Sequence, residues 1–128
     1  MRMMSFALTE PQLMDGSKTV TRRTGWQNLK PGTRLLAVRK AMGLKAGEKV
    51  HALCEIEVIS VRRIMLADID KNDCAAEGFP HYSPDDFTAM FIKHMGIKTT
   101  PDKAFVTRIE FRKVPGTALA AYQSRFPI

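Results

Sequence analysis

Cysteine and tryptophan are scarce in this chain, which has two cysteines and one tryptophan in 128 residues. Cys54 and Cys74 lie in different segments and lack the C-x-x-C spacing of a zinc site, so neither a zinc site nor a disulfide framework is indicated. His51 and His94 have no metal-ligand spacing with each other or with a pair of carboxylates. We therefore expect no metal and no cofactor, and both cysteines should pack as small residues of a reduced, intracellular protein.

Long hydrophobic runs are also missing. No stretch approaches the roughly 20 apolar residues that a membrane-spanning helix requires, and residues 1–4 lack the apolar run of a secretory signal. The sequence contains no repeat and no low-complexity block. Its length is the usual size of one domain. We expect one cytoplasmic domain over residues 1–114, followed by a C-terminal tail over residues 115–128.

Acidic residues are outnumbered, because 13 Asp and Glu face 20 Lys and Arg, and the formal charge is +7. The corresponding isoelectric point is about 9.7. Such a balance attracts polyanions, and nucleic acid is the obvious candidate partner. A small positive charge can also serve solubility alone, so charge by itself does not decide between these interpretations.

Apolar periodicity and turn residues predict a strand-rich chain with two modest helices. The first helix begins at Thr9, with Gln12 completing a capping box, and ends at Gly16. The second begins at Ser83 and ends at Gly96. Strands are expected at residues 5–8, 18–23, 34–39, 51–64 and 104–114, and less regular segments at residues 43–47 and 68–77. This order predicts an α+β fold with a curled, mixed sheet that forms a small barrel with helices at its ends.

Alternation along the predicted strands assigns side chains to faces. In residues 18–23, Lys18 and Arg22 share one face, while Thr21 and Arg23 share the other. A twist or bend would bring Lys18 and Thr21 together, but alternation alone does not. The same rule groups these residues on one face of each long strand: Ile56, Val58 and Ser60 in the first, and Phe105, Thr107, Ile109 and Phe111 in the second.

The segment Gly16-Ser17-Lys18-Thr19-Val20-Thr21-Arg22-Arg23 resembles the signature of the ASCH superfamily, written G-x-K-x-x-[E/T]-x-R. Gly16, Lys18, Thr21 and Arg23 occupy the matching positions. The context is similar as well: a K-P-G turn at residues 30–33, an A-x-x-E-G-F-like segment at residues 75–79 and a closing strand at residues 106–111. The resemblance spans residues 3–114.

The chain departs from the family pattern in two places. Thr33 replaces the acidic residue that often follows the Pro-Gly turn, and the Lys-rich insert at residues 42–49 is longer than in the smallest members. The rim of the site is therefore expected to differ. The resemblance implies a PUA-like mixed β-barrel flanked by two or three short helices, with a cleft lined by the motif, similar to domains that bind RNA or modified bases.

Within this superfamily, small bacterial 4-acetylcytidine amidohydrolases use the motif lysine, the motif threonine and a downstream glutamate. Residue by residue, the resemblance assigns these catalytic positions to Lys18, Thr21 and Glu77. Hydrolysis of an amide needs a nucleophile or activated water, a base, and a donor for the oxyanion. Thr21 would attack or orient water, Lys18 would act as base if burial and nearby Arg23 lower its pKa, and Glu77 would carry a proton to the leaving amine. The roles of Lys18 and Glu77 can also be exchanged.

Other residues are candidates for contact with a ligand. Arg23 suits recognition of a phosphate or carbonyl group, and Trp26 can stack on a base, although a lone tryptophan is more often a core anchor. His81 and Tyr82, close to Glu77 in the sequence, are candidates for base contacts. A basic rim for RNA phosphates is expected from Lys40, Lys45, Lys49, Arg62 and Arg63.

Each catalytic candidate also has an ordinary structural interpretation. Lys18 fits a solvated strand lysine, Thr21 a common β-strand residue, and Glu77 a turn residue that binds a backbone amide. We favour an RNA- or nucleoside-binding domain with a Lys/Thr/Glu cleft. The alternatives are an amidohydrolase that deacylates 4-acetylcytidine or a related acylated pyrimidine nucleoside, and a metal-independent ribonuclease that acts through Lys18 and Arg23.

Overall fold

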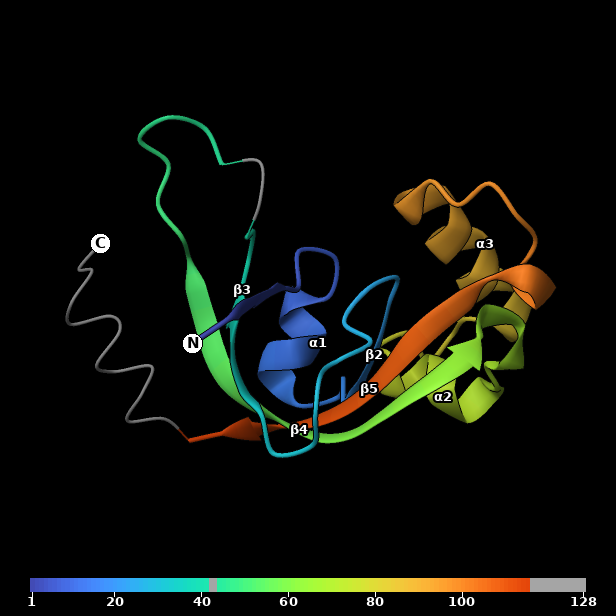
Figure 1. Cartoon of the computed structure of the whole chain (residues 1–128), viewed down its shortest axis with the longest axis horizontal. Helices are drawn as coiled ribbons and strands as arrows, with labels where there is room; N and C mark the ends of the chain where they lie inside the picture. Colours follow the sequence, from blue (N-terminus) through green and yellow to red (C-terminus); the bar gives the residue numbers. More distant parts are fainter. Residues whose placement is uncertain (42–43, 116–128) are drawn as a thin grey trace.

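A mixed sheet of five strands forms the centre of the part of the chain that the structure, a computed structural model, describes: residues 1–41 and 44–115 (Figure 1). The neighbours β1 and β3 run parallel, and the other neighbouring pairs are antiparallel. The strands follow the order β1-β3-β4-β5-β2, with β1 at Met3–Ser5, β2 at Val20–Arg23, β3 at Arg34–Val38, β4 at Ala52–Met65 and β5 at Phe105–Val114.

The sheet is curled, because the long strands β4 and β5 bend along their length and α1 (Glu10–Asp15) lies in the curve (Figure 1). The predicted α+β class and the curled, mixed sheet are confirmed. The sheet stays open where a barrel was expected, since no hydrogen-bonded pair joins the edge strands β1 and β2 within the described residues. These strands have only three and four residues, and α1 lies between them. Except for Pro115, the expected tail lies outside the described residues, as does Gly43 of the expected connection.

Both predicted helices form and end where their glycines indicate. α3 (Pro84–Met95) begins with a capping box, in which Ser83 and Asp86 each accept a hydrogen bond from the other's backbone amide. It ends at Gly96, which has a φ of 64°. Likewise α1 ends at Gly16, with a φ of 84°, a left-handed conformation that glycine adopts without strain.

The predicted capping box of α1 does not form. Thr9 makes no side-chain hydrogen bond at the start of the helix, and Gln12 Nε2 donates instead to the carbonyl oxygen of Gly78, at 3.2 Å. The Gln12 side chain is not available to the start of α1, because it binds the turn that follows a third helix, α2 (Lys71–Ala76). This contact joins α1, which leads into the motif at Gly16, to the turn that follows Glu77.

The helix α2 occupies a segment for which a helical turn mixed with a loop was expected. It is regular because Asp70 caps it, accepting a hydrogen bond of 2.8 Å from the Asp73 amide. Two short 3-10 turns, Leu66–Asp68 and Pro101–Lys103, precede α2 and β5.

Two large hydrophobic clusters pack against the sheet, and a third, smaller one consists of Leu36, Val38 and Ala52. The first includes residues of α1, the β1–α1 loop and the middle of the sheet, among them Phe6, Leu13, Leu35, Ile56 and Phe111. The second joins α2 and α3 to the far ends of β4 and β5, and includes Leu66, Cys74, Phe87, Phe91 and Val106. Cys54 is buried in the first cluster and Cys74 in the second, and burial raises the pKa of both thiols, opposite to what a nucleophilic cysteine needs.

The long strands change their buried face between the two clusters. A bulge between Val58 and Ser60 shifts the register of β4 against β5, so Val61 rather than Ser60 packs against the first cluster. In β5, Phe105 is 58% exposed, whereas Val106 is buried in the second cluster. The predicted face was wrong at Ser60, because the bulge turns it away from Val58. Phe105 lies on the predicted face of β5 but is exposed, because the second cluster covers the opposite side of the sheet from the first.

Candidate functional site

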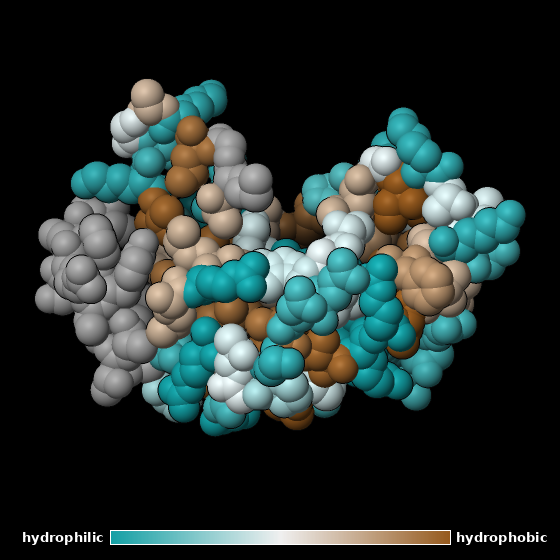
Figure 2. All heavy atoms as spheres, viewed as in Figure 1, coloured by the Kyte–Doolittle hydropathy of each residue, from teal (hydrophilic) through white to brown (hydrophobic). Residues whose placement is uncertain are grey.

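A cavity of about 270 Å³ opens beside the edge strand β2, where segments far apart in the sequence meet. Figure 2 shows the molecule hollowed between the β3–β4 connection and α3. The polar lining consists mainly of Lys18, Thr21, Arg22, Arg23 and Glu77. The apolar lining includes Phe6, Leu8, Phe79, Phe87, Met90, Phe91 and Met95. Charged and apolar residues therefore share the lining, and we call these two sets the charged side and the apolar side of the cavity.

The strand β2 presents the motif to the cavity from both of its faces. Its pairing with β5 confirms the predicted alternation. Lys18 and Arg22 bind groups of α2 and its C-terminal end, whereas Thr21 and Arg23 lie toward the β1–α1 loop. Both sets line one cavity because β2 is the last strand of the sheet. The edge position thus brings Lys18 and Thr21 to the same space.

Lys18 is enclosed at the bottom of the charged side. Its side chain is 3% exposed, and Nζ donates to Glu77 Oε1 at 2.9 Å and to the Glu77 carbonyl oxygen at 2.8 Å. Burial lowers the pKa of Lys18, and the Glu77 carboxylate opposes that shift. Gly78, with a φ of 103°, turns the chain so closely that a Cβ there would lie 3.0 Å from Gln12 Cβ. This turn directs both acceptor groups of Glu77 to Lys18.

Arg22 belongs to the site although the sequence analysis did not include it among the site residues. Its side chain is 2% exposed, Nη1 donates to Glu77 Oε2 at 3.2 Å, and Nη2 donates to Asp73 Oδ2 at 2.7 Å. It lies on the opposite face of β2 from Arg23, as expected, yet it lines the same cavity. A signal was available: Asp73 and Glu77 are four residues apart, so a helix places both carboxylates on one side.

Thr21 and Arg23 form the other part of the charged side. Arg23 Nε donates to Thr21 Oγ1 at 3.1 Å, and Nη2 donates to the Ser5 carbonyl oxygen at 2.6 Å. The guanidinium also lies over the Phe6 ring, 4.9 Å from its centroid. Burial lowers the pKa of Arg23 to about 10. The Thr21 oxygen therefore accepts a hydrogen bond from a cation, which stabilises negative charge on that oxygen.

The helix α3 supplies most of the apolar side. Phe87 and Phe91 are buried with stacked rings, 6.0 Å between centroids, while Met95 is 41% exposed. Met90 and His94 complete this wall. Sequence analysis missed it, because apolar residues at helical spacing are found on any helix that faces a core.

No protein-family model and no curated protein sequence matches this chain. Solved structures do match. The ASCH domain from Lactobacillus crispatus JV V101 is 16% identical, with a TM-score of 0.57 over 88% of this chain and 78% of the other. The fold is ASCH-like.

Two further solved structures have the same ASCH-like fold. Protein EF3133 from Enterococcus faecalis V583, of family DUF984, is 16% identical with a TM-score of 0.58, over 83% of this chain and 69% of the other. The hypothetical protein PH0355 is 15% identical with a TM-score of 0.61, over 88% of this chain and 97% of the other. At such low identity these matches establish the predicted PUA-like architecture and leave the activity open.

Three predicted contact residues lie away from the cavity of this ASCH-like fold. Trp26 packs against the first hydrophobic cluster with the Arg2 guanidinium 4.1 Å over its ring, which agrees with the core-anchor interpretation. Tyr82 stacks on Phe79, 4.8 Å between centroids, and His81 is exposed. The structure brings none of the three into the cavity lining, and their contact with RNA stays a prediction.

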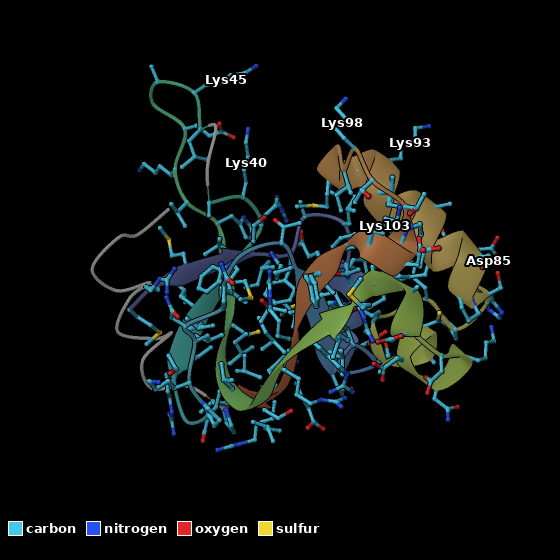
Figure 3. The ribbon with its side chains drawn as sticks, turned by 45° about the vertical axis from the view of Figure 1, so that its right-hand side comes forward. Lys40, Lys45, Asp85, Lys93, Lys98 and Lys103 are labelled. Carbon is cyan, nitrogen blue, oxygen red and sulfur yellow. The ribbon has the colours of Figure 1, made fainter. Side chains whose placement is uncertain are left out.

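The predicted basic rim is divided between two places. Figure 3 shows Lys40 and Lys45 on the β3–β4 connection, opposite Lys93 and Lys98 at and beyond the end of α3. Lys40 and Lys49 line a second cavity of about 290 Å³, and Lys40 Nζ lies 3.7 Å from a Glu48 carboxylate oxygen. By contrast, Arg62 and Arg63 lie on β4 and line neither cavity, and the Arg63 guanidinium lies 5.5 Å over the Phe105 ring.

Within residues 1–41 and 44–115, no group of three or more His, Cys, Asp or Glu side chains could hold a metal ion. In the same residues, no helix has the length and apolar character to cross a membrane.

Proposed function

We propose that this ASCH-like chain binds one nucleobase, carried by RNA or by a free nucleoside, in the cavity beside β2. The proposal depends on one observation: apolar side chains and buried hydrogen-bonding groups line the same cavity of about 270 Å³. Ligand pockets in proteins usually span about 300–1,000 Å³, so this cavity suits one small ligand. A base has matching chemistry, because its faces stack on apolar groups and its edges carry hydrogen-bonding groups.

The charged side favours a ligand that presents carbonyl oxygens. Lys18 and Arg23 are donors, and the Thr21 hydroxyl accepts from Arg23 and can donate its own hydrogen. The two oxygens of Glu77 are already bound by Lys18 and Arg22. Acceptors on the ligand are therefore better matched than donors, as in a pyrimidine with its carbonyl group. The charge of +7 supports an RNA strand, whereas a free nucleoside needs no basic track.

Binding is tested by NMR titration of the 15N-labelled chain with cytidine and with 4-acetylcytidine. We expect amide shifts that concentrate on β2 and α3. Thr21→Val should weaken binding about tenfold, because it removes a hydroxyl at nearly constant volume. Thr107→Val is the matched control, since Thr107 is also buried in the sheet but does not line the cavity. Absence of shifts at millimolar nucleoside, or equal losses in the two variants, would refute the proposal.

A second candidate function is hydrolysis of 4-acetylcytidine or a related acylated pyrimidine nucleoside. It is favoured by a buried lysine with a lowered pKa in the same cavity as a threonine oxygen that accepts from Arg23. Thr21 Oγ1, or a water that it orients, would attack the acyl carbon, and neutral Lys18 would take the proton. The C–N bond then breaks, and the leaving nitrogen receives a proton through Lys18 or Glu77, whose side chains are hydrogen-bonded. If Thr21 is the nucleophile, a water molecule then hydrolyses the acyl-threonine ester, which releases the carboxylate and restores the hydroxyl.

Chromatography of 4-acetylcytidine reactions tests this second function. The parent chain should release cytidine, and Lys18→Ala should release none above the background rate. Arg22→Lys is a useful companion, because it retains a cation next to Glu77 without replacing Lys18. No turnover by the parent chain would exclude the amidohydrolase and leave the binding proposal standing. Incubation with RNA and a chelator tests the ribonuclease alternative by the appearance of fragments.

A further inference from the structure

A row of alternating charges leads from the cavity to the surface behind it. From the inside outward its members are Lys18, Glu77, Arg22, Asp73 and Arg108. The first three side chains are at most 4% exposed, whereas Asp73 and Arg108 are 19% and 13% exposed. Asp73 and Arg108 do not line the cavity. They can influence a ligand there only through the residues between.

Asp73 is shared by two arginines from neighbouring strands. Arg108 Nε donates to Oδ2 at 2.7 Å and Nη2 donates to Oδ1 at 3.0 Å, while Arg22 Nη2 also donates to Oδ2 at 2.7 Å. Arg22 and Arg108 are directly opposite each other in the β2–β5 register, so their like charges share one face of the sheet. The Asp73 carboxylate offsets this repulsion and holds the Arg22 guanidinium in place.

Arg22 in turn divides the Glu77 carboxylate with Lys18. Arg22 binds Oε2 and Lys18 binds Oε1. A guanidinium released from Asp73 would have two donors to direct at Glu77, and arginine–carboxylate pairs are often bidentate. Lys18 would then share its acceptor oxygen with a competing cation.

We propose that Asp73, held by Arg108, is a positioning residue that keeps Arg22 on one oxygen of Glu77 and reserves the other for Lys18. This inference rests on the proposed function in one respect: it takes Lys18 as a working group of the cavity. The charged groups that act on Lys18 are the Glu77 carboxylate, which raises its pKa, and Arg23 and Arg22, which lower it. Loss of Asp73 should therefore lower the pKa of Lys18, because Arg22 moves toward Glu77.

The test follows Lys18 itself, through the 13Cε resonance of the lysine-labelled full chain during a pH titration, with Lys18→Arg to assign the signal. Asp73→Asn is expected to move the titration midpoint of Lys18 to lower pH. Arg108→Gln is expected to move it to higher pH, because Asp73 then attracts Arg22 with both oxygens and Glu77 is left to Lys18. The two variants should differ in the sign of their shifts.

Matched controls separate positioning from a general change in charge. Asp70→Asn removes the same charge at the N-cap of the same helix and retains a good cap, since Asp70 accepts a hydrogen bond from the Asp73 amide. Among the described residues, Asp70 forms no ion pair that the substitution would break. For Arg108, the control is Arg112→Gln, a residue of the same strand that pairs with Glu57. Each control should leave the midpoint of Lys18 close to that of the parent.

The proposal is overturned if Asp73→Asn and Asp70→Asn move the titration midpoint of Lys18 equally. It is also overturned if Asp73→Asn lowers the melting temperature but leaves that midpoint unchanged. If Asp73→Asn fails to fold, Arg108→Gln decides, and a midpoint that does not rise overturns the proposal. Nucleoside binding is measured separately by the amide shifts described above. Opposite shifts of Lys18 without any nucleoside binding would therefore refute the proposed function and support the positioning role.

Discussion

The two sides of the cavity are held in different ways. On the β2–α2 side, buried charges hold one another: Glu77 is 59 residues from Lys18 and 55 from Arg22 in the sequence. On the α3 side, Phe87, Phe91 and Met90 pack in the second hydrophobic cluster, and Met95 is 41% exposed. A buried charge that loses its partner is costly, whereas methionine adapts to a new neighbour at little cost. Under the proposed function we therefore expect the charged side to select which ligand atoms are recognised, and the apolar side to determine how closely a ligand is enclosed.

Removing the shared Glu77 carboxylate should have the largest effect on the free energy of unfolding, because it disrupts the charged side. Glu77→Ala leaves Lys18 and Arg22 buried without their common partner, and breaking a buried ion pair typically costs about 3–5 kcal/mol. Glu57→Ala is the control, because its partner Arg112 is about half exposed and the expected loss is below about 1 kcal/mol. Urea unfolding measures both. Equal losses would contradict the assignment of the buried network as the rigid side.

Acid should weaken the outer part of the charged side by an intermediate amount. Hydrogen bonds from Arg108 and Arg22 lower the pKa of Asp73 from 3.8 to about 2. The folded chain thus binds this proton less readily than the unfolded chain, so the contribution is complete above about pH 4 and is lost as the pH falls toward 2. The shift corresponds to about 2 kcal/mol.

Urea unfolding of the parent and Asp73→Asn as a function of pH measures this contribution. The difference between their free energies of unfolding should shrink as the pH falls below about 4. A difference that stays constant across this range would show that the Asp73 ion pairs add nothing to stability.

The smallest effect is expected on the apolar side. Met95→Ala shortens a side chain that is 41% exposed, so the free energy of unfolding should change by less than about 1 kcal/mol, while nucleoside affinity falls about threefold. Met14→Ala, on α1, is the control, because Met14 is 43% exposed and does not line the cavity. NMR titration measures the affinities. The same affinity in both variants would mean that α3 does not enclose the ligand.

Local sequence predicted the features that depend on neighbouring residues. The capping box of Ser83, the glycine end of α1 at Gly16 and the alternation within β2 all formed as expected, since each depends on backbone geometry within a few residues. The resemblance of residues 16–23 to the ASCH signature also pointed to the fold that the solved structures share. Lys18, Thr21 and Glu77, expected from that resemblance, all line one cavity.

Long-range contacts explain the predictions that were wrong. Gln12 binds the Gly78 carbonyl group instead of completing a capping box, because α1 packs beside the turn after α2. The bulge next to Ser60 changed which residues of β4 face the core. None of these outcomes has a signal within a few residues of the side chain concerned.

By itself, the sequence determined α1, α3, the longer strands, the basic character and the motif, because helix caps, strand alternation and net charge depend on residue type and spacing. Only the tertiary structure decided that β2 lies at the sheet edge, that Arg22 joins Lys18 on Glu77, and that α3 closes the cavity. The physical reason is that a buried charge needs a partner of opposite charge, and that partner can come from any part of the chain. In this protein the partners of the motif come from a helix more than 50 residues away, and no local pattern specifies that pairing.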